Sequence, residues 1–142
     1  MAPETPVRPQ FALPLPPLIR LALITPVATA LAVSGAGFLA GLDRQVSVGL
    51  ALGATAGLVG ALCGLWALKP KKPTDVTRWP ARLLTAQLAT FAGVLVSGLL
   101  LYSAARPGPV WFALSAAGVC TWSLIAQAKV FAAAFEQSKQ NA

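Results

Sequence analysis

The chain has 142 residues, of which 56% are hydrophobic and 11% charged, and its formal net charge is +7. Its mean hydropathy is +0.70, and its long apolar stretches lack the polar face that a helix of a water-soluble protein turns toward solvent. The composition therefore excludes a water-soluble globular domain and is typical of a small integral membrane protein.

Proline dominates the beginning of the chain. Residues 1–17 contain Pro3, Pro6, Pro9, Pro14, Pro16 and Pro17. Because proline fixes φ and cannot donate a backbone hydrogen bond, this stretch is predicted to be an extended, polyproline-like flexible tail. The tail is expected to lead into the membrane domain, and docking to another protein is the alternative role.

The first apolar segment, 21–42, is long enough to cross a hydrocarbon layer of about 30 Å. Pro26 removes one helical hydrogen bond and is expected to kink this helix near Thr25. The apolar run is longer than the roughly 7 to 15 residues of a secretory signal. We therefore expect it to be retained as a membrane helix.

The second apolar segment, 46–68, is uncharged and repeats glycine at helical spacing. At about 1.5 Å per residue it measures roughly 34 Å, which is enough to span. Small residues on one side allow a neighbouring helix backbone to approach closely, since apolar side chains gain little by exchanging lipid for each other. This glycine face is expected to hold the chain's own bundle together or to dock another membrane subunit. It consists of Gly49, Gly53, Gly57, Gly60 and Gly64.

Two further apolar segments, 83–104 and 109–128, complete the predicted membrane domain. Gln127 and Lys129 interrupt the last segment, so we expect it to leave the bilayer near Lys129 and continue as a short interfacial turn. Residues 136–142 are predicted to be a polar, frayed tail. The predicted fold is all-α: an integral membrane four-helix bundle made of two transmembrane hairpins over residues 18–135.

The basic residues are distributed unevenly among the connections. Nine fall in the N-terminal stretch, the loop between the second and third segments, and the C-terminal stretch; they are Arg8, Arg20, Lys69, Lys71, Lys72, Arg78, Arg82, Lys129 and Lys139. Only Arg44 and Arg106 fall in the other two connections. The positive-inside rule therefore places both termini and the loop 69–82 in the cytoplasm, as expected for a multi-pass protein of a bacterial inner membrane.

Aromatic residues agree with these membrane boundaries. Trp66 and Trp79 flank the cytoplasmic loop, where amphipathic rings favour the headgroup region. Trp122 lies deeper and is predicted to contact other helices of the bundle.

The net positive charge has a simple explanation. The bases sit at membrane edges and no folded domain presents them as a patch, so nucleic acid is excluded as a partner. The cytoplasmic basic loop, with Lys69, Lys71, Lys72 and Arg78, is predicted to fix topology. Attraction to anionic lipid, worth about 1 kcal/mol for each nearby base, accompanies it.

Side chains that carry catalysis are scarce in this chain. There is no histidine, and the acids Glu4, Asp43, Asp75 and Glu136 all fall in tails or connections. General acid–base catalysis and metal sites need such groups to converge, so neither an enzyme nor a cofactor is expected. An ion-translocating subunit is disfavoured because it would need a carboxylate at membrane depth.

Three residues at the start of the third segment are candidates for a polar contact with another subunit. Arg82 is expected to reach the cytoplasmic headgroups, and Gln87 lies about one turn deeper, where it could bond across helices. Thr85 lies between them.

The chain resembles the ATP synthase protein I family. The resemblance covers spans one to three and is carried by Leu21-Ala-Leu-Ile-Thr25, Leu50-Ala-Leu-Gly53-Ala-Thr-Ala-Gly57, the basic link 69–82 and Ala81-Arg82-Leu-Leu-Thr-Ala-Gln87. It implies a small four-span accessory protein that helps to assemble or stabilise the proteolipid ring of the synthase, with the glycine face as a contact.

The sequence thus predicts a non-catalytic membrane accessory or assembly subunit, with the ATP synthase membrane sector as the first candidate complex. The alternative is a small oligomeric carrier or channel that uses the hydroxyl and amide groups of the spans. In either case the partners are the lipid bilayer and other membrane chains.

We predict that the loop 69–82 faces the cytoplasm, because of the asymmetry of basic residues. Single cysteines at Pro73 and Gly108 in a cysteine-free background should differ in labelling by an impermeant reagent added outside. Position 108 should be labelled and position 73 protected, and the reverse result would contradict the topology.

Overall fold

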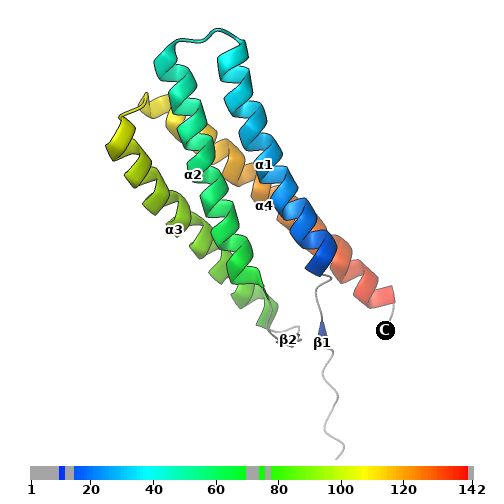
Figure 1. Cartoon of the computed structure of the whole chain (residues 1–142). Helices are drawn as coiled ribbons and strands as arrows, with labels where there is room; N and C mark the ends of the chain where they lie inside the picture. The colour runs from blue at the N-terminus through cyan, green and yellow to red at the C-terminus, as the bar shows by residue number, and fades with distance from the viewer. Residues whose placement is uncertain (1–9, 12–14, 70–73, 76–77, 141–142) are drawn as a thin grey trace, which may run out of the picture.

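The computed structural model describes residues 10–11, 15–69, 74–75 and 78–140 (Figure 1). Four helices account for nearly all of these: α1 (Leu15–Leu39), α2 (Arg44–Leu68), α3 (Trp79–Ala105) and α4 (Pro109–Gln140). Two strands of two residues each, β1 (Gln10–Phe11) and β2 (Thr74–Asp75), pair antiparallel, with Gln10 opposite Asp75. The described part of the chain is therefore a four-helix structure that is all-α apart from this short strand pair.

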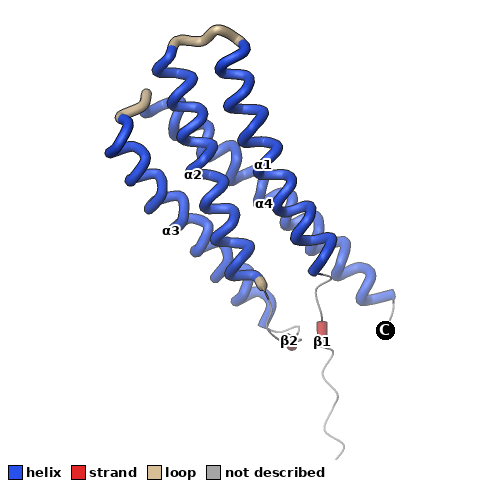
Figure 2. Tube along the Cα trace, in the orientation of Figure 1, coloured by secondary structure: helices blue, strands red, loops and turns tan. Residues whose placement is uncertain are grey.

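Helix α2 is at the centre of the packing. It contacts α1, α3 and α4, and α1 also packs against α4. Short loops join α1 to α2 and α3 to α4 at the upper end of the view in Figure 2, whereas the end of α2, the start of α3 and β2 lie at the lower end. There β2 pairs with β1, which precedes α1 in the chain.

Three helices are long and apolar enough to cross a membrane by length and composition: Arg44–Leu68, Trp79–Ala105 and Pro109–Ala133. In α1 the apolar part within the described residues is shorter, Leu23–Leu39. At about 1.5 Å per residue this part measures roughly 25 Å, against a hydrocarbon layer of about 30 Å. The complete α1 of 25 residues is long enough, although its first turns add prolines and Arg20.

Helix α1 starts earlier and ends earlier than predicted. It begins at Leu15, so the expectation that residues 15–17 are extended was wrong. Pro16 and Pro17 fit the first helical turn because the N–H groups there have no intrahelical acceptor. The helix ends at Leu39 instead of residue 42, and Gly41 adopts a left-handed φ of 62°. The rest of the tail, 1–9 and 12–14, lies outside the described residues.

Helix α4 continues past the predicted exit near Lys129. It runs without a break to Gln140, so the predicted interfacial turn, and the frayed tail as far as Gln140, were wrong. No glycine or proline follows Gly118, and alanine, glutamine and lysine after Ala126 are strong helix formers. A polar residue marks a possible exit from the bilayer but does not end a helix.

Trp122 has the opposite environment to the one predicted: expected within the bundle, it is 54% exposed. Trp79 begins α3 at the edge of the loop, as predicted, but it is only 3% exposed and its ring lies 5.6 Å from that of Phe131 on α4. Helical phase decides the exposure of Trp122, because this residue lies at the edge of the buried side of α4, which is formed by Ser115, Ala116, Val119, Cys120 and Ser123.

A buried serine closes the hairpin between α1 and α2. The Ser47 hydroxyl donates to the Gly37 carbonyl oxygen at 3.1 Å and to the Leu42 carbonyl oxygen at 3.3 Å. Gly37 lies in the last turn of α1, where carbonyl groups lack helical N–H donors. On the other side of the turn, the Asp43 carboxylate accepts from the Arg44 backbone N–H at the start of α2.

Replacing this serine should weaken the hairpin. We expect Ser47→Ala to destabilise the folded protein by about 1 kcal/mol, because a buried carbonyl loses its donor. Thermal unfolding in detergent measures the change. Ser103→Ala is the matched control, since Ser103 is exposed and bonds only its own helix. Equal melting temperatures for the two variants would contradict the assigned role.

Candidate functional site

The glycine face of α2 divides between two neighbouring helices. Gly49, Gly53 and Gly57 face α4: a Cβ atom added at Gly49 would lie 3.2 Å from the Gly108 carbonyl oxygen, and one at Gly57 would lie 2.9 Å from the Ala116 carbonyl oxygen. A Cβ at Gly53 would overlap the Phe112 carbonyl oxygen and the Ser115 hydroxyl. The backbones of α2 and α4 therefore lie so close together that only glycine, which has no side chain, fits at these positions of α2 without a shift of neighbouring atoms.

Gly60 and Gly64 face α3 instead. A Cβ at Gly60 would lie 2.7 Å from the Thr90 carbonyl oxygen, and one at Gly64 would overlap the Thr90 hydroxyl. Thr90 is almost completely buried, and its hydroxyl donates to the Ala86 carbonyl oxygen at 2.9 Å. All five glycines of the glycine face thus pack within the chain, and all five are buried.

The two cysteines lie in these same helix contacts. A Cβ at Gly93 would lie 3.0 Å from the Cys63 Sγ, and the Cys120 Sγ approaches the Gly57 carbonyl oxygen at 3.9 Å. Both thiols are free. They act as small packing residues beside glycine.

The polar candidates on α3 have different environments. Thr85 is exposed, and its hydroxyl donates to the Ala81 carbonyl oxygen of the same helix at 2.9 Å. Arg82 is half-buried, and its guanidinium carbon lies 5.9 Å from the centre of the Trp79 ring, a cation–π distance. The ring holds this charge at the start of α3.

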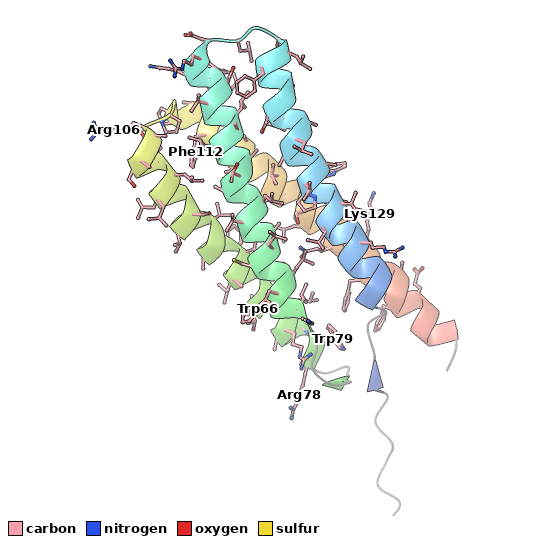
Figure 3. The ribbon with its side chains drawn as sticks, in the orientation of Figure 1. Trp66, Arg78, Trp79, Arg106, Phe112 and Lys129 are labelled. Atoms are coloured by element: carbon pink, nitrogen blue, oxygen red, sulfur yellow. The ribbon has the colours of Figure 1, made fainter. Side chains whose placement is uncertain are left out.

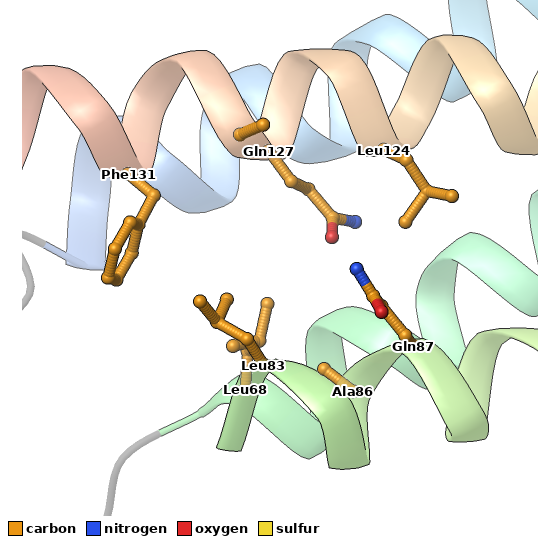
Figure 4. A pocket seen from close by; sticks show the side chains of 8 residues that line it. Leu68, Leu83, Ala86, Gln87, Leu124, Gln127 and Phe131 are labelled. Atoms are coloured by element: carbon orange, nitrogen blue, oxygen red, sulfur yellow. The ribbon is translucent and has the colours of Figure 1, made fainter. Parts of the chain in front are cut away.

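Gln87 lies beside a crevice between α3 and α4. The crevice has a volume of about 200 Å³ and is lined by Leu68, Leu83, Ala86, Gln87, Leu124, Gln127, Ala128 and Phe131. Figure 4 shows the carboxamides of Gln87 and Gln127 pointing toward one another across it. The Gln127 amide donates to the Ser123 hydroxyl at 3.4 Å, whereas the Gln87 side chain makes no hydrogen bond to any described part of the chain.

The basic loop is described only at its ends. Lys69 and Arg78 are exposed, and Figure 3 places Arg78 at the lower end of the molecule beside Trp79. Lys71 and Lys72 lie outside the described residues.

Most hydroxyl groups in the helices are bonded locally. Thr29, Thr55, Thr85 and Thr90 each donate to the carbonyl oxygen four residues earlier. Ser97 does the same at 2.6 Å and also reaches the Ala56 carbonyl oxygen of α2 at 3.4 Å. Among the described residues, no group of three histidine, cysteine or acidic side chains is placed to hold a metal ion.

Sequence reasoning missed both the position of Gln127, which faces Gln87 across the crevice, and the contact of Trp79 with Phe131. In the sequence, Gln127 stands out as an interruption of an apolar run. Its position four residues after Ser123 and four before Phe131 places all three on one side of α4, which was a detectable signal. Which helix that side would face was not detectable from the sequence.

Comparisons with models of protein families, with curated proteins and with solved structures found no match for this chain.

Packing at the glycine face predicts that the same substitution, glycine to alanine, affects the stability of the protein differently at two positions. Gly53→Ala should destabilise the protein by roughly 1–3 kcal/mol, because the methyl group must displace the backbone of α4. Gly118→Ala should be neutral or stabilising by up to about 1 kcal/mol, since nothing lies within 4 Å of the added Cβ and alanine favours the helix.

Thermal unfolding of both variants in the same detergent is the measurement. A gain in melting temperature for Gly53→Ala equal to that for Gly118→Ala would mean that α2 and α4 are not in close contact at this point.

Proposed function

We propose that this chain is a non-catalytic accessory or assembly subunit of a larger membrane complex, with the ATP synthase membrane sector as the first candidate. The observation that carries the proposal is the exposed Gln87 carboxamide on α3, which bonds to no described residue. In hydrocarbon an amide without a partner is costly, so a neighbouring membrane helix with a hydrogen-bonding group would be stabilised at this position.

The surroundings of Gln87 support contact with another helix. Large apolar side chains follow one another along the exposed side of α3, including Leu84, Leu88, Phe91 and Leu95. Helix α3 buries only Trp79, Ala86, Thr90 and Gly98 in its own bundle. A partner helix could therefore lie along most of its length without displacing α1, α2 or α4.

A non-catalytic role is supported by how the polar groups are used. The hydroxyls in the helices bond carbonyl groups of the same helix or of the adjacent one. The acidic side chains that the structure describes, Asp43 and Glu136, lie next to the start of α2 and in the last turns of α4. Asp43 caps the start of α2, and neither acid lies in the middle of a helix.

The choice of the synthase rests on the sequence resemblance of spans one to three. The alternative, an oligomeric carrier or channel, is favoured by the two carboxamides that face each other across the crevice. Exposed Thr55 and Thr85 lie outside the bundle, so a polar path would have to run between copies of the chain.

Affinity purification from native membranes in mild detergent, followed by mass spectrometry, tests the proposal. Membrane subunits of the ATP synthase should co-purify with the wild-type chain, and Gln87→Leu should reduce their yield roughly 3- to 20-fold, the effect of one hydrogen bond between membrane helices. Thr85→Val is the control, because the Thr85 hydroxyl is already bonded within α3.

The possible failures are distinct. Specific capture of a different membrane complex that depends on Gln87 would reject the synthase and keep the accessory role. Absence of any stoichiometric partner, together with solute flux in liposomes that Gln87→Leu abolishes, would reject the accessory role in favour of a carrier or channel.

A further inference from the structure

The crevice between α3 and α4 has the form of a partial ligand site. Its volume of about 200 Å³ is below the roughly 300–1,000 Å³ of pockets that enclose a whole drug-sized ligand. Six of the eight lining side chains are apolar, and the C-terminal residue of α2, Leu68, contributes to the wall. Such a site fits one part of an elongated amphipathic molecule.

A cation lies near one end of the crevice. Phe131 lines the crevice, its ring contacts that of Trp79, and the Arg82 guanidinium lies over the Trp79 ring. Lys69 follows the lining residue Leu68 directly, and Arg78 precedes Trp79. The two aromatic rings thus connect an apolar cavity to a group of positive charges.

Charge at this end of the molecule is strongly unbalanced. Among the side chains that the structure describes here, the bases are Arg20, Lys69, Arg78, Arg82 and Lys129, and the acid is Glu136. Glu136 is exposed, five residues beyond Phe131 on α4, which places it on a different side of that helix. An anionic group would therefore be attracted to the crevice end at Arg82.

The distance along α3 between Arg82 and Gln87 also fits an elongated amphipathic molecule. Between Arg82 and Gln87 the helix rises about 7.5 Å at about 1.5 Å per residue. One interfacial layer of a bilayer is about 5–8 Å thick, half the difference between a hydrocarbon core of about 30 Å and a total of about 40–45 Å. With the guanidinium among the headgroups, the two carboxamides lie at the level where ester groups give way to acyl chains.

We propose that this crevice binds one anionic phospholipid, with its phosphate at Arg82 and an acyl chain against Leu83, Leu124, Ala128 and Phe131. The Gln127 carboxamide can donate to an ester oxygen, because its bond to Ser123 uses only one of its two N–H groups. Apolar walls select a lipid over free phosphate. The excess of positive charge selects an anionic headgroup over a zwitterionic one.

The site is built from a single chain and goes beyond the proposed function. Gln87 has several hydrogen-bonding positions, so it can contact a partner helix from outside while its neighbours contact the lipid. Binding to purified protein, with no partner present, therefore tests the lipid site alone.

Native mass spectrometry of the full-length chain with phosphatidylglycerol or phosphatidylcholine is the test. The wild type should retain phosphatidylglycerol preferentially, and inorganic phosphate should not displace it. Arg82→Gln should lower phosphatidylglycerol retention about fivefold, the effect of one base, and Arg82→Lys should keep most of it. Arg44→Gln removes one exposed charge at the opposite end and should change nothing.

A second variant tests the crevice itself. Ala128→Trp should fill the cavity from the exposed side of α4 and abolish tight binding, and the smaller Ala128→Leu serves if the tryptophan variant does not fold. Equal retention of both lipids, or equal losses for Arg44→Gln and Arg82→Gln, would overturn the site. Unchanged lipid retention in Ala128→Trp would also overturn the site. If the same variant then loses a membrane protein that co-purifies with the wild type from native membranes, the crevice belongs to a partner helix instead.

Discussion

Close approach of helix backbones to α2 is the constraint on which the rest of the structure depends. In a bilayer, apolar side chains gain little by moving from lipid to protein, so helices are held by dispersion contacts that fall off steeply with distance. Gly53 and Gly57 let the backbone of α4 lie against α2, and Gly60 and Gly64 do the same for α3. Alanines at positions 54, 56 and 61 are fully buried between these contacts.

Much of this could be predicted from the sequence, because it depends on composition along a single helix. Apolar runs located all four helices, and the glycine spacing identified the helix with a close-packed surface. The division of the glycine face between two neighbours could not be predicted, because Gly57 and Gly60 differ in helical phase by an amount compatible with one broad face or with two. Tertiary packing decides between these cases.

Environments of single large side chains were the least predictable feature. Hydropathy alone does not distinguish lipid from protein interior, so it could not predict which of Trp79 and Trp122 is buried. Trp79 is buried because α3 begins opposite Phe131, and Trp122 is exposed because α4 turns Val119 and Ser123 toward the bundle. Helix ends were predicted wrongly for a related reason: the sequence prediction ends the tail at Pro17 and the fourth span near Lys129, although both residues fit within a helix.

The crevice follows from the division of the glycine face between two neighbouring helices. Helices α3 and α4 each pack against α2 more extensively than against each other. They meet near their short connection, where the rings of Tyr102 and Phe112 are 5.9 Å apart, and again at the far end through Trp79 and Phe131. Between the second contact and the bundle centre, the small residues Ala86 and Ala128 leave space that α2 does not fill. Because α4 packs against α2 at Gly49, Gly53 and Gly57, and α3 packs against it further along at Gly60 and Gly64, α3 and α4 are not drawn together beside this second contact. Gln87 and Gln127 lie in the space that remains.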